Sequence, residues 1–175
     1  ETKNEMKRVQ EQKEQVEKEV EKINTNITKT TDDIVKTQDE VAQTREEIEQ
    51  LNEEIGELEK RIAERDKLLK ERVRSMQLNG GAINYLEVLL GAQSFGDFLD
   101  RVLALNTIAE QDRAIIEAQK ADKEALEEAK QAVETKLEEL EAELDKLETL
   151  KKELKTQLDE KDELLGQLEE EEEHL

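Results

Sequence analysis

Hydrophobic residues in the first part of the chain recur at alternating spacings of three and four. One set of positions, seven residues apart, holds Met6, Lys13, Val20, Ile27, Ile34, Val41, Ile48, Ile55, Ile62, Leu69 and Met76. The companion set holds Val9, Val16, Ile23, Thr30, Thr37, Thr44, Leu51, Leu58, Arg65 and Arg72. This alternation is the a and d pattern of a left-handed coiled coil. It predicts a first coiled-coil arm over residues 1–78.

The end of this arm is ambiguous. Arg65 and Arg72 occupy seam positions, while the apolar Leu68 and Val73 lie beside them. Because a seam is normally apolar, we expect it to drift here, so that Leu68 and Val73 join it and the two arginines leave it.

A second heptad pattern predicts a second arm over residues 112–175. Its d positions hold Leu126, Val133, Leu140, Leu147, Leu154, Lys161 and Leu168. Its a positions hold Ile116, Lys123, Lys130, Leu137, Leu144, Lys151, Leu158 and Leu165.

The segment between the arms has a different composition. Residues 79–111 contain four of the six glycines and all three aromatic residues. Asn79-Gly80-Gly81 is expected to end the first helix, because glycine readily adopts the left-handed conformation that follows a helix C-terminus. A short helix is predicted over 82–90, with Gly91 ending it. The Ser94–Asp97 stretch is typical of a capping box that starts the next helix.

Two arms on either side of a glycine-rich turn predict an all-α fold, a long antiparallel two-helix coiled-coil hairpin with short helices at the tip. In the expected register Ile34 faces Leu154 and Ile55 faces Val133, although a shift of seven residues fits almost as well. A parallel homodimer is the alternative. Threonines and lysines at seam positions also leave room for a third helix or a homodimer that covers the groove.

Composition and charge narrow the function. The chain has 43% charged residues and a formal net charge of −21, which argues against nucleic acid, because phosphates require a basic face. The same charge argues against docking on anionic lipid. No apolar run approaches the roughly 20 residues of a membrane span, so no direct membrane insertion is expected.

Catalytic chemistry is not expected either. The chain has no cysteine, and its one histidine is His174. A cysteine-histidine or serine-histidine triad and a zinc site with nitrogen and sulfur ligands therefore cannot be built. We expect no catalytic, metal-binding or cofactor-binding residues.

Basic residues gather near the end of the first arm, at Lys60, Arg61, Arg65, Lys67, Lys70, Arg72 and Arg74. Cations near a helix C-terminus complement the helix dipole, and this is the simpler interpretation. The alternative is a site for an anion or an acidic partner.

The tip supplies the candidate site. A nine-residue helix is too short to persist alone in water, so its apolar residues need a covering surface. They can bury one another in a small knob, or part of the surface can remain open for a partner, since exposed apolar patches usually mark interfaces. The candidate partner-binding residues are Tyr85, Leu86, Leu89, Leu90, Phe95, Phe98 and Leu99.

The stretch NYLEVLLGAQSFGDFLDR, residues 84–101, resembles a known family. It is similar to the N-terminal coiled-coil domain of exported bacterial peptidoglycan hydrolases of the PcsB and CwlO type. The matching pattern continues through Ile108, Ala109, Asp112 and Arg113. The resemblance implies a hairpin whose tip bears short helices and binds the extracellular loop of FtsX, in the FtsEX membrane complex. It also implies that the domain restrains or positions a C-terminal hydrolase domain, which this chain lacks.

The resemblance favours a non-catalytic regulatory and partner-binding module of a cell-wall hydrolase, acting in cell division or elongation. Its implied location is extracellular, at the interface of cell wall and membrane in a Gram-positive-type bacterium. The competing interpretation is a structural cytoplasmic coiled-coil spacer or scaffold. A spacer requires only a chain reversal, whereas this chain has about 30 residues of apolar, turn-rich sequence between its arms.

Overall fold

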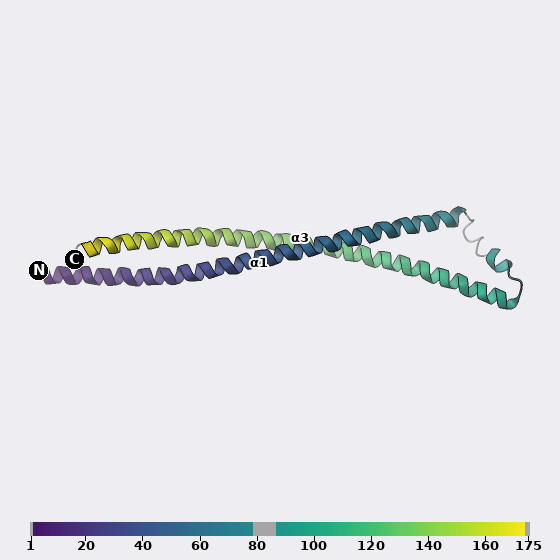
Figure 1. Ribbon diagram of the computed structural model, residues 1–175, viewed down its shortest axis with the longest axis horizontal. Helices are drawn as coiled ribbons and strands as arrows, with labels where there is room; N and C mark the ends of the chain where they lie inside the picture. Colours follow the sequence, from purple (N-terminus) through teal and green to yellow (C-terminus); the bar gives the residue numbers. More distant parts are fainter. Residues whose placement is uncertain (1, 79–86, 174–175) are drawn as a thin grey trace. The chain divides into compact units, whose positions relative to one another are not determined.

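A computed structural model describes the backbone of residues 2–78 and 87–173, and the side chains of 2–75 and 87–173 (Figure 1). It contains two long helices, α1 (Thr2–Leu78) and α3 (Phe95–Glu173), and a helical stretch at residues 87–90. The described residues form no strand. The absence of proline from the chain allows helices of 77 and 79 residues, because an interior proline would break the hydrogen-bond ladder.

Two units divide the described residues. The first contains the residues up to Glu47 together with those from Lys136 onward, and the second is Ile48–Thr135. Within each unit α1 and α3 pack side by side in opposite directions. The first unit contains a Lys13–Glu172 ion pair and a Thr44–Glu143 hydrogen bond. The predicted all-α antiparallel hairpin is therefore confirmed.

The seam predicted for α1 is confirmed from Val9 to Leu69, whereas Met6, its first member, is 55% exposed. Its most buried apolar members are Val16, Ile34, Val41 and Leu58, the last only 2% exposed. Threonines at the companion positions are equally buried; Thr37 is 1% exposed. A small, branched threonine lets the two helices approach closely, and its hydroxyl can bond within its own helix, as Thr37 does to the Asp33 carbonyl at 2.7 Å.

The predicted drift of the seam near residue 70 is wrong. Arg65 and Arg72 remain partly buried on the seam face, whereas Leu68 and Val73 are 42% and 54% exposed. Arginine can lay its aliphatic stem along a seam while its guanidinium reaches a polar partner. Both arginines find such a partner on α3.

The predicted seam of α3 is half correct. Its d positions are partly buried as expected. The predicted a positions are exposed instead, including Leu137 at 49% and Leu158 at 44%. The residues that face α1 precede them by one, namely Ile115, Asp122, Ala129, Lys136, Glu143, Leu150, Gln157 and Leu164. This rotation leaves the ammonium groups of Lys123, Lys130 and Lys151 in water. Burial of these charges in the seam would be costly.

The observed register is about four residues from the predicted one. The prediction places Arg65 opposite position 123 and Arg72 opposite position 116, whereas Arg65 bonds Gln119 as well as Asp122, and Arg72 pairs with Asp112. The difference accompanies the rotation of α3, because the rotated face meets the α1 seam at a different offset. The Asn79-Gly80-Gly81 turn and positions 82–86 of the predicted short helix lie outside the described residues.

Candidate protein-interaction site at residues 87–103

A helical stretch and a sharp turn lead into α3. The Gly91 amide donates to the Glu87 carbonyl at 2.9 Å, and the Ala92 amide donates to the Leu89 carbonyl at 3.3 Å. A Cβ at Gly91 would lie 3.1 Å from Nη1 of Arg101 and 3.3 Å from the Glu87 oxygen. Glycine suits this position because a side chain would crowd the arginine and the Glu87 carbonyl. The helical stretch ends at Gly91, as predicted.

Ser94 caps the N-terminus of α3. Its hydroxyl accepts the Asp97 amide at 3.1 Å, and its carbonyl accepts the Phe98 amide at 2.9 Å. The Asp97 carboxylate accepts the Gln93 amide at 3.1 Å, whereas a standard capping box would return to the Ser94 amide. The predicted cap at Ser94 is confirmed, but the Asp97 carboxylate bonds the amide of Gln93 in place of that of Ser94.

Arg101 joins the turn to α3. Its Nε donates to Oδ2 of Asp97 at 3.2 Å, and its Nη1 donates to the Val88 carbonyl at 2.6 Å. The carbonyl of Val88 belongs to the last turn of the helical stretch, where backbone acceptors lack intrahelical partners. Sequence reasoning assigned no role to Arg101. The only signal was its spacing of four from Asp97.

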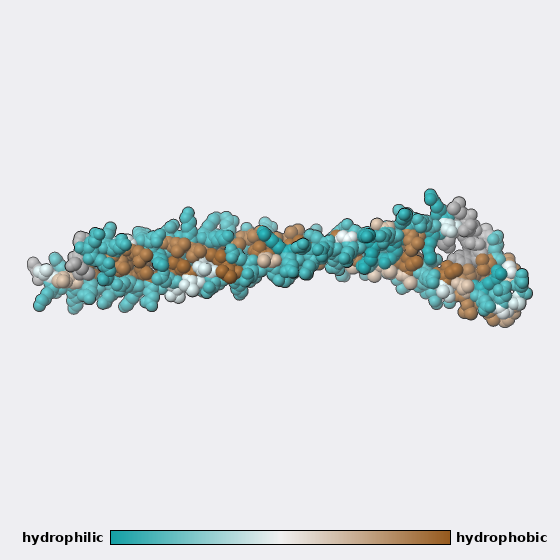
Figure 2. All heavy atoms as spheres, viewed as in Figure 1, coloured by the Kyte–Doolittle hydropathy of each residue, from teal (hydrophilic) through white to brown (hydrophobic). Residues whose placement is uncertain are grey.

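Apolar side chains in this segment face solvent. Leu90 is 77% exposed, Phe95 76%, Leu99 46% and Phe98 38%, while Leu89 is partly buried. Tyr85 and Leu86, the other two predicted site residues, lie outside the described residues. Leu103, which the prediction omitted, is 64% exposed. Apolar surface is visible at the start of α3, and further apolar patches lie along the two long helices on the face shown (Figure 2).

The basic residues near the end of α1 make ion pairs with α3. Arg65 lies 2.6 Å from Oδ2 of Asp122 and Arg61 lies 3.2 Å from Oδ1, while Arg72 pairs with Asp112. The hydrogen bond from Arg65 holds the pKa of Asp122 below its ordinary value, and the charge of Arg61 acts in the same direction. Three of the seven predicted basic residues therefore stabilise the helix pair.

No described helix is long and apolar enough to cross a membrane. The described residues also hold no group of three or more histidine, cysteine, aspartate or glutamate side chains placed to bind a metal ion. What residues 87–103 offer is an open apolar surface on a hydrogen-bonded turn, which suits binding to a protein partner.

Comparison with known proteins agrees with the resemblance noted from the sequence. Residues 55–129 match the family described as the coiled-coil domain of peptidoglycan hydrolase PcsB. A similar curated protein is the peptidoglycan DL-endopeptidase CwlO of Bacillus licheniformis, which is 57% identical over 51 residues. That alignment covers 29% of this chain and 11% of the relative, so this chain corresponds to a small part of it. Over residues 55–129, which include the whole 87–103 segment, this chain is similar to the coiled-coil domain of PcsB-type peptidoglycan hydrolases.

Proposed function

We propose that this chain is the non-catalytic regulatory and partner-binding domain of an extracellular cell-wall hydrolase. In this account residues 87–103 bind the extracellular loop of FtsX and so couple the hydrolase to the FtsEX membrane complex during division or elongation. The match to a coiled-coil domain of peptidoglycan hydrolases supports the link to the cell wall. The link to FtsX comes from the family resemblance.

The observation that carries the proposal is the exposure of Leu90 and Phe95, at 77% and 76%. Large apolar side chains that are this open cost solubility, and contiguous ones usually mark a binding surface. The hydrogen bonds of Ser94, Asp97 and Arg101 hold the turn in one conformation. A partner therefore meets a surface that is already ordered, which lowers the entropic cost of binding.

A binding titration with the purified FtsX extracellular loop tests the proposal. Leu90→Asp and Phe95→Asp should each weaken binding by about thirtyfold or more, the effect of losing an interface hot spot. Helical circular dichroism should not change, because both side chains are already exposed. The matched control is Val35→Asp, which changes an apolar side chain of α1 that is 52% exposed and lies far along the sequence from this segment.

The same titration addresses the spacer interpretation. A spacer would not bind the FtsX loop at all, and its exposed apolar residues could be replaced without effect on any partner. Binding that survives both aspartate variants at wild-type affinity would remove residues 87–103 from the proposed site. Binding lost equally in Val35→Asp would show that the effect is not local.

A further inference from the structure

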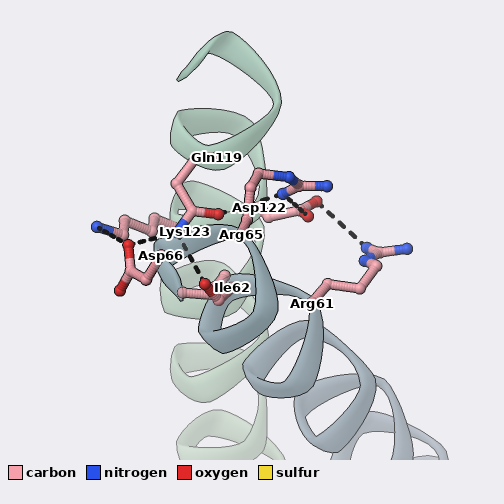
Figure 3. Close-up of polar contacts among 7 residues, drawn as sticks. All are labelled: Arg61, Ile62, Arg65, Asp66, Gln119, Asp122 and Lys123. Carbon is pink, nitrogen blue, oxygen red and sulfur yellow. Dashed lines mark hydrogen bonds and ion pairs between the residues drawn. The ribbon is translucent and has the colours of Figure 1, made fainter. Parts of the chain in front are cut away.

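A buried amide lies between α1 and α3 in the second unit. Gln119 is 4% exposed, and its amide nitrogen donates to the Ile62 carbonyl at 3.0 Å and to the Asp66 carboxylate at 2.8 Å. Its amide oxygen accepts from Arg65 at 3.3 Å. All three contacts come from α1 (Figure 3). Both amide hydrogens and the oxygen are thus satisfied across the helix pair.

Ion pairs extend this contact on both sides (Figure 3). Asp122, one turn beyond Gln119, accepts from Arg65 at 2.6 Å and from Arg61 at 3.2 Å. Lys123 lies 4.0 Å from the carboxylate of Asp66. We call the set of Arg61, Ile62, Arg65, Asp66, Gln119, Asp122 and Lys123 the Gln119 layer.

The apolar seam around this layer does not by itself define one register. Ile55, Ile62 and Leu69 repeat every seven residues on α1, and Leu126 and Val133 do so on α3. Sliding one helix past the other by one heptad would replace one aliphatic contact by another of similar size. Such substitutions change stability little, so the polar contacts must distinguish the registers.

A one-heptad shift disrupts the Gln119 layer in either direction. If α3 slides toward the start of α1, Asp122 meets Leu58 and Glu54 where it now meets Arg65 and Arg61. If α3 slides the other way, Val73 takes the place of Asp66 and one donor of Gln119 loses its acceptor. One shift leaves the partly buried Asp122 carboxylate without a partner, and the other leaves a donor of the buried Gln119 without one. Either loss is more costly than the loss of one solvent-exposed hydrogen bond.

We propose that the Gln119 layer selects the register of α1 and α3 in the second unit. A single buried polar residue in a coiled-coil seam is known to specify register at some cost in stability. The layer lies in the same unit as residues 87–103. A partner bound there therefore cannot slide α3 along α1 within that unit unless it breaks the layer.

Disulfide formation between pairs of introduced cysteines measures the register, because the chain has no cysteine of its own. Pairs at Leu51 with Val133 and at Leu58 with Leu126 have the same offset as the Arg65–Gln119 and Arg72–Asp112 contacts, so they report the observed register. Pairs at Leu51 with Leu126 and at Leu58 with Val133 report the two shifted registers. A heptad shift moves a residue by about 10 Å along the axis, well beyond the roughly 7 Å between Cα atoms that a disulfide spans.

Each pair is oxidised in the otherwise unchanged chain and in the variant Gln119→Leu with Asp122→Leu. Thr30→Val with Thr37→Val is the matched control. It also replaces two buried polar residues of the seam, at 5% and 1% exposure, but neither hydroxyl bonds α3 in the described part of the chain. Circular dichroism should remain helical for every protein, because all the replacements suit a coiled-coil seam.

The unchanged chain and the threonine control should form only the two disulfides of the observed register. In the Gln119 and Asp122 variant, the yield of at least one shifted disulfide should rise about tenfold or more relative to the observed-register pairs. A variant that retains the wild-type disulfide pattern would overturn the proposal. Shifted disulfides in the unchanged chain, or equal amounts in the threonine control, would also overturn it.

Discussion

Nη1 of Arg101 donates a hydrogen bond to the backbone carbonyl of Val88, 13 residues earlier in the chain, at 2.6 Å. The same guanidinium bonds Asp97 at the start of α3. One side chain therefore links the two helical segments that lie on either side of the turn at residues 91–94. This contact holds the exposed Leu90 and Phe95 on an ordered backbone.

Replacing Arg101 by alanine should loosen this turn. The Val88 carbonyl and the Asp97 carboxylate each lose a donor, and one hydrogen bond contributes about 1 kcal/mol. Because two such bonds are lost, amide hydrogen exchange at residues 88–97 should accelerate by about thirtyfold. Asp100→Ala is the control, because Asp100 is exposed and makes no polar contact in the described part of the chain. Unchanged exchange in Arg101→Ala would show that the contact is not needed.

Gly91→Ala should act through the same arginine. Its Cβ would lie 3.1 Å from Nη1 of Arg101, a contact that displaces the guanidinium and costs the bond to Val88. Exchange of the Gly91 and Ala92 amides should accelerate in the variant. Because both changes remove one interaction, adding Gly91→Ala to Arg101→Ala should accelerate exchange far less than Gly91→Ala does alone. Fully additive effects would contradict this geometry.

A hydrogen bond across the first unit leads to a stability prediction. The Thr44 hydroxyl donates to Oε1 of Glu143 at 2.6 Å, while Oε2 of Glu143 is buried without a hydrogen bond among the described residues. Thr44→Val should lower the free energy of unfolding by about 1–3 kcal/mol, because it leaves a partly buried carboxylate without its donor. Adding Glu143→Leu should restore at least wild-type stability. Urea denaturation measures both effects, and a double variant less stable than Thr44→Val would refute the explanation.

Acid should remove the contribution of Asp122. The hydrogen bond from Arg65 lowers the pKa of this carboxyl below its ordinary value of 3.8. A carboxyl with a lowered pKa stabilises the folded state above about pH 4, and this contribution is lost as the pH falls through the lowered value. Wild type should therefore melt at a higher temperature than Asp122→Asn at pH 7, and the difference should shrink as the pH falls toward about 2.

Asp100→Asn serves as the control for that comparison, because Asp100 has no cationic partner among the described residues. It should melt like the wild type at both pH values. A difference between wild type and Asp122→Asn that stays constant down to pH 2 would mean that the ion pairs of Asp122 do not stabilise the fold.

Most of the α1 seam could be predicted from sequence, because isoleucine, valine and leucine recur every seven residues and mark one face. Its end could not, because the arginines at positions 65 and 72 stay on the seam only through their partners on α3. The face of α3 could not, because apolar and charged residues lie next to each other at each heptad. Glu143 faces α1 in place of Leu144 because it bonds Thr44. Asp122 faces α1 in place of Lys123 because it bonds Arg65. Those partners are known only once the two helices are paired.

The candidate site also has a part that could be predicted from the sequence and a part that could not. Ser94, Asp97 and Gly91 could be recognised because caps and helix ends have local sequence signals. The hydrogen bond between Arg101 and Val88 spans an irregular turn. It could not be predicted from the sequence, because contacts across irregular backbone leave no periodic pattern. The exposure of Leu90 and Phe95 depends on how that loop folds, so sequence reasoning had to leave open whether these residues bury one another.

Amide hydrogen exchange of the whole chain, with and without the FtsX extracellular loop, tests the central claim most directly. Binding should slow exchange in residues 87–103 and leave the first unit unchanged, because Leu90, Phe95 and Leu103, the most exposed large apolar side chains among the described residues, lie in that segment. Protection confined to the first unit, or no protection anywhere at saturating FtsX loop, would contradict the assignment of this segment as the partner-binding site.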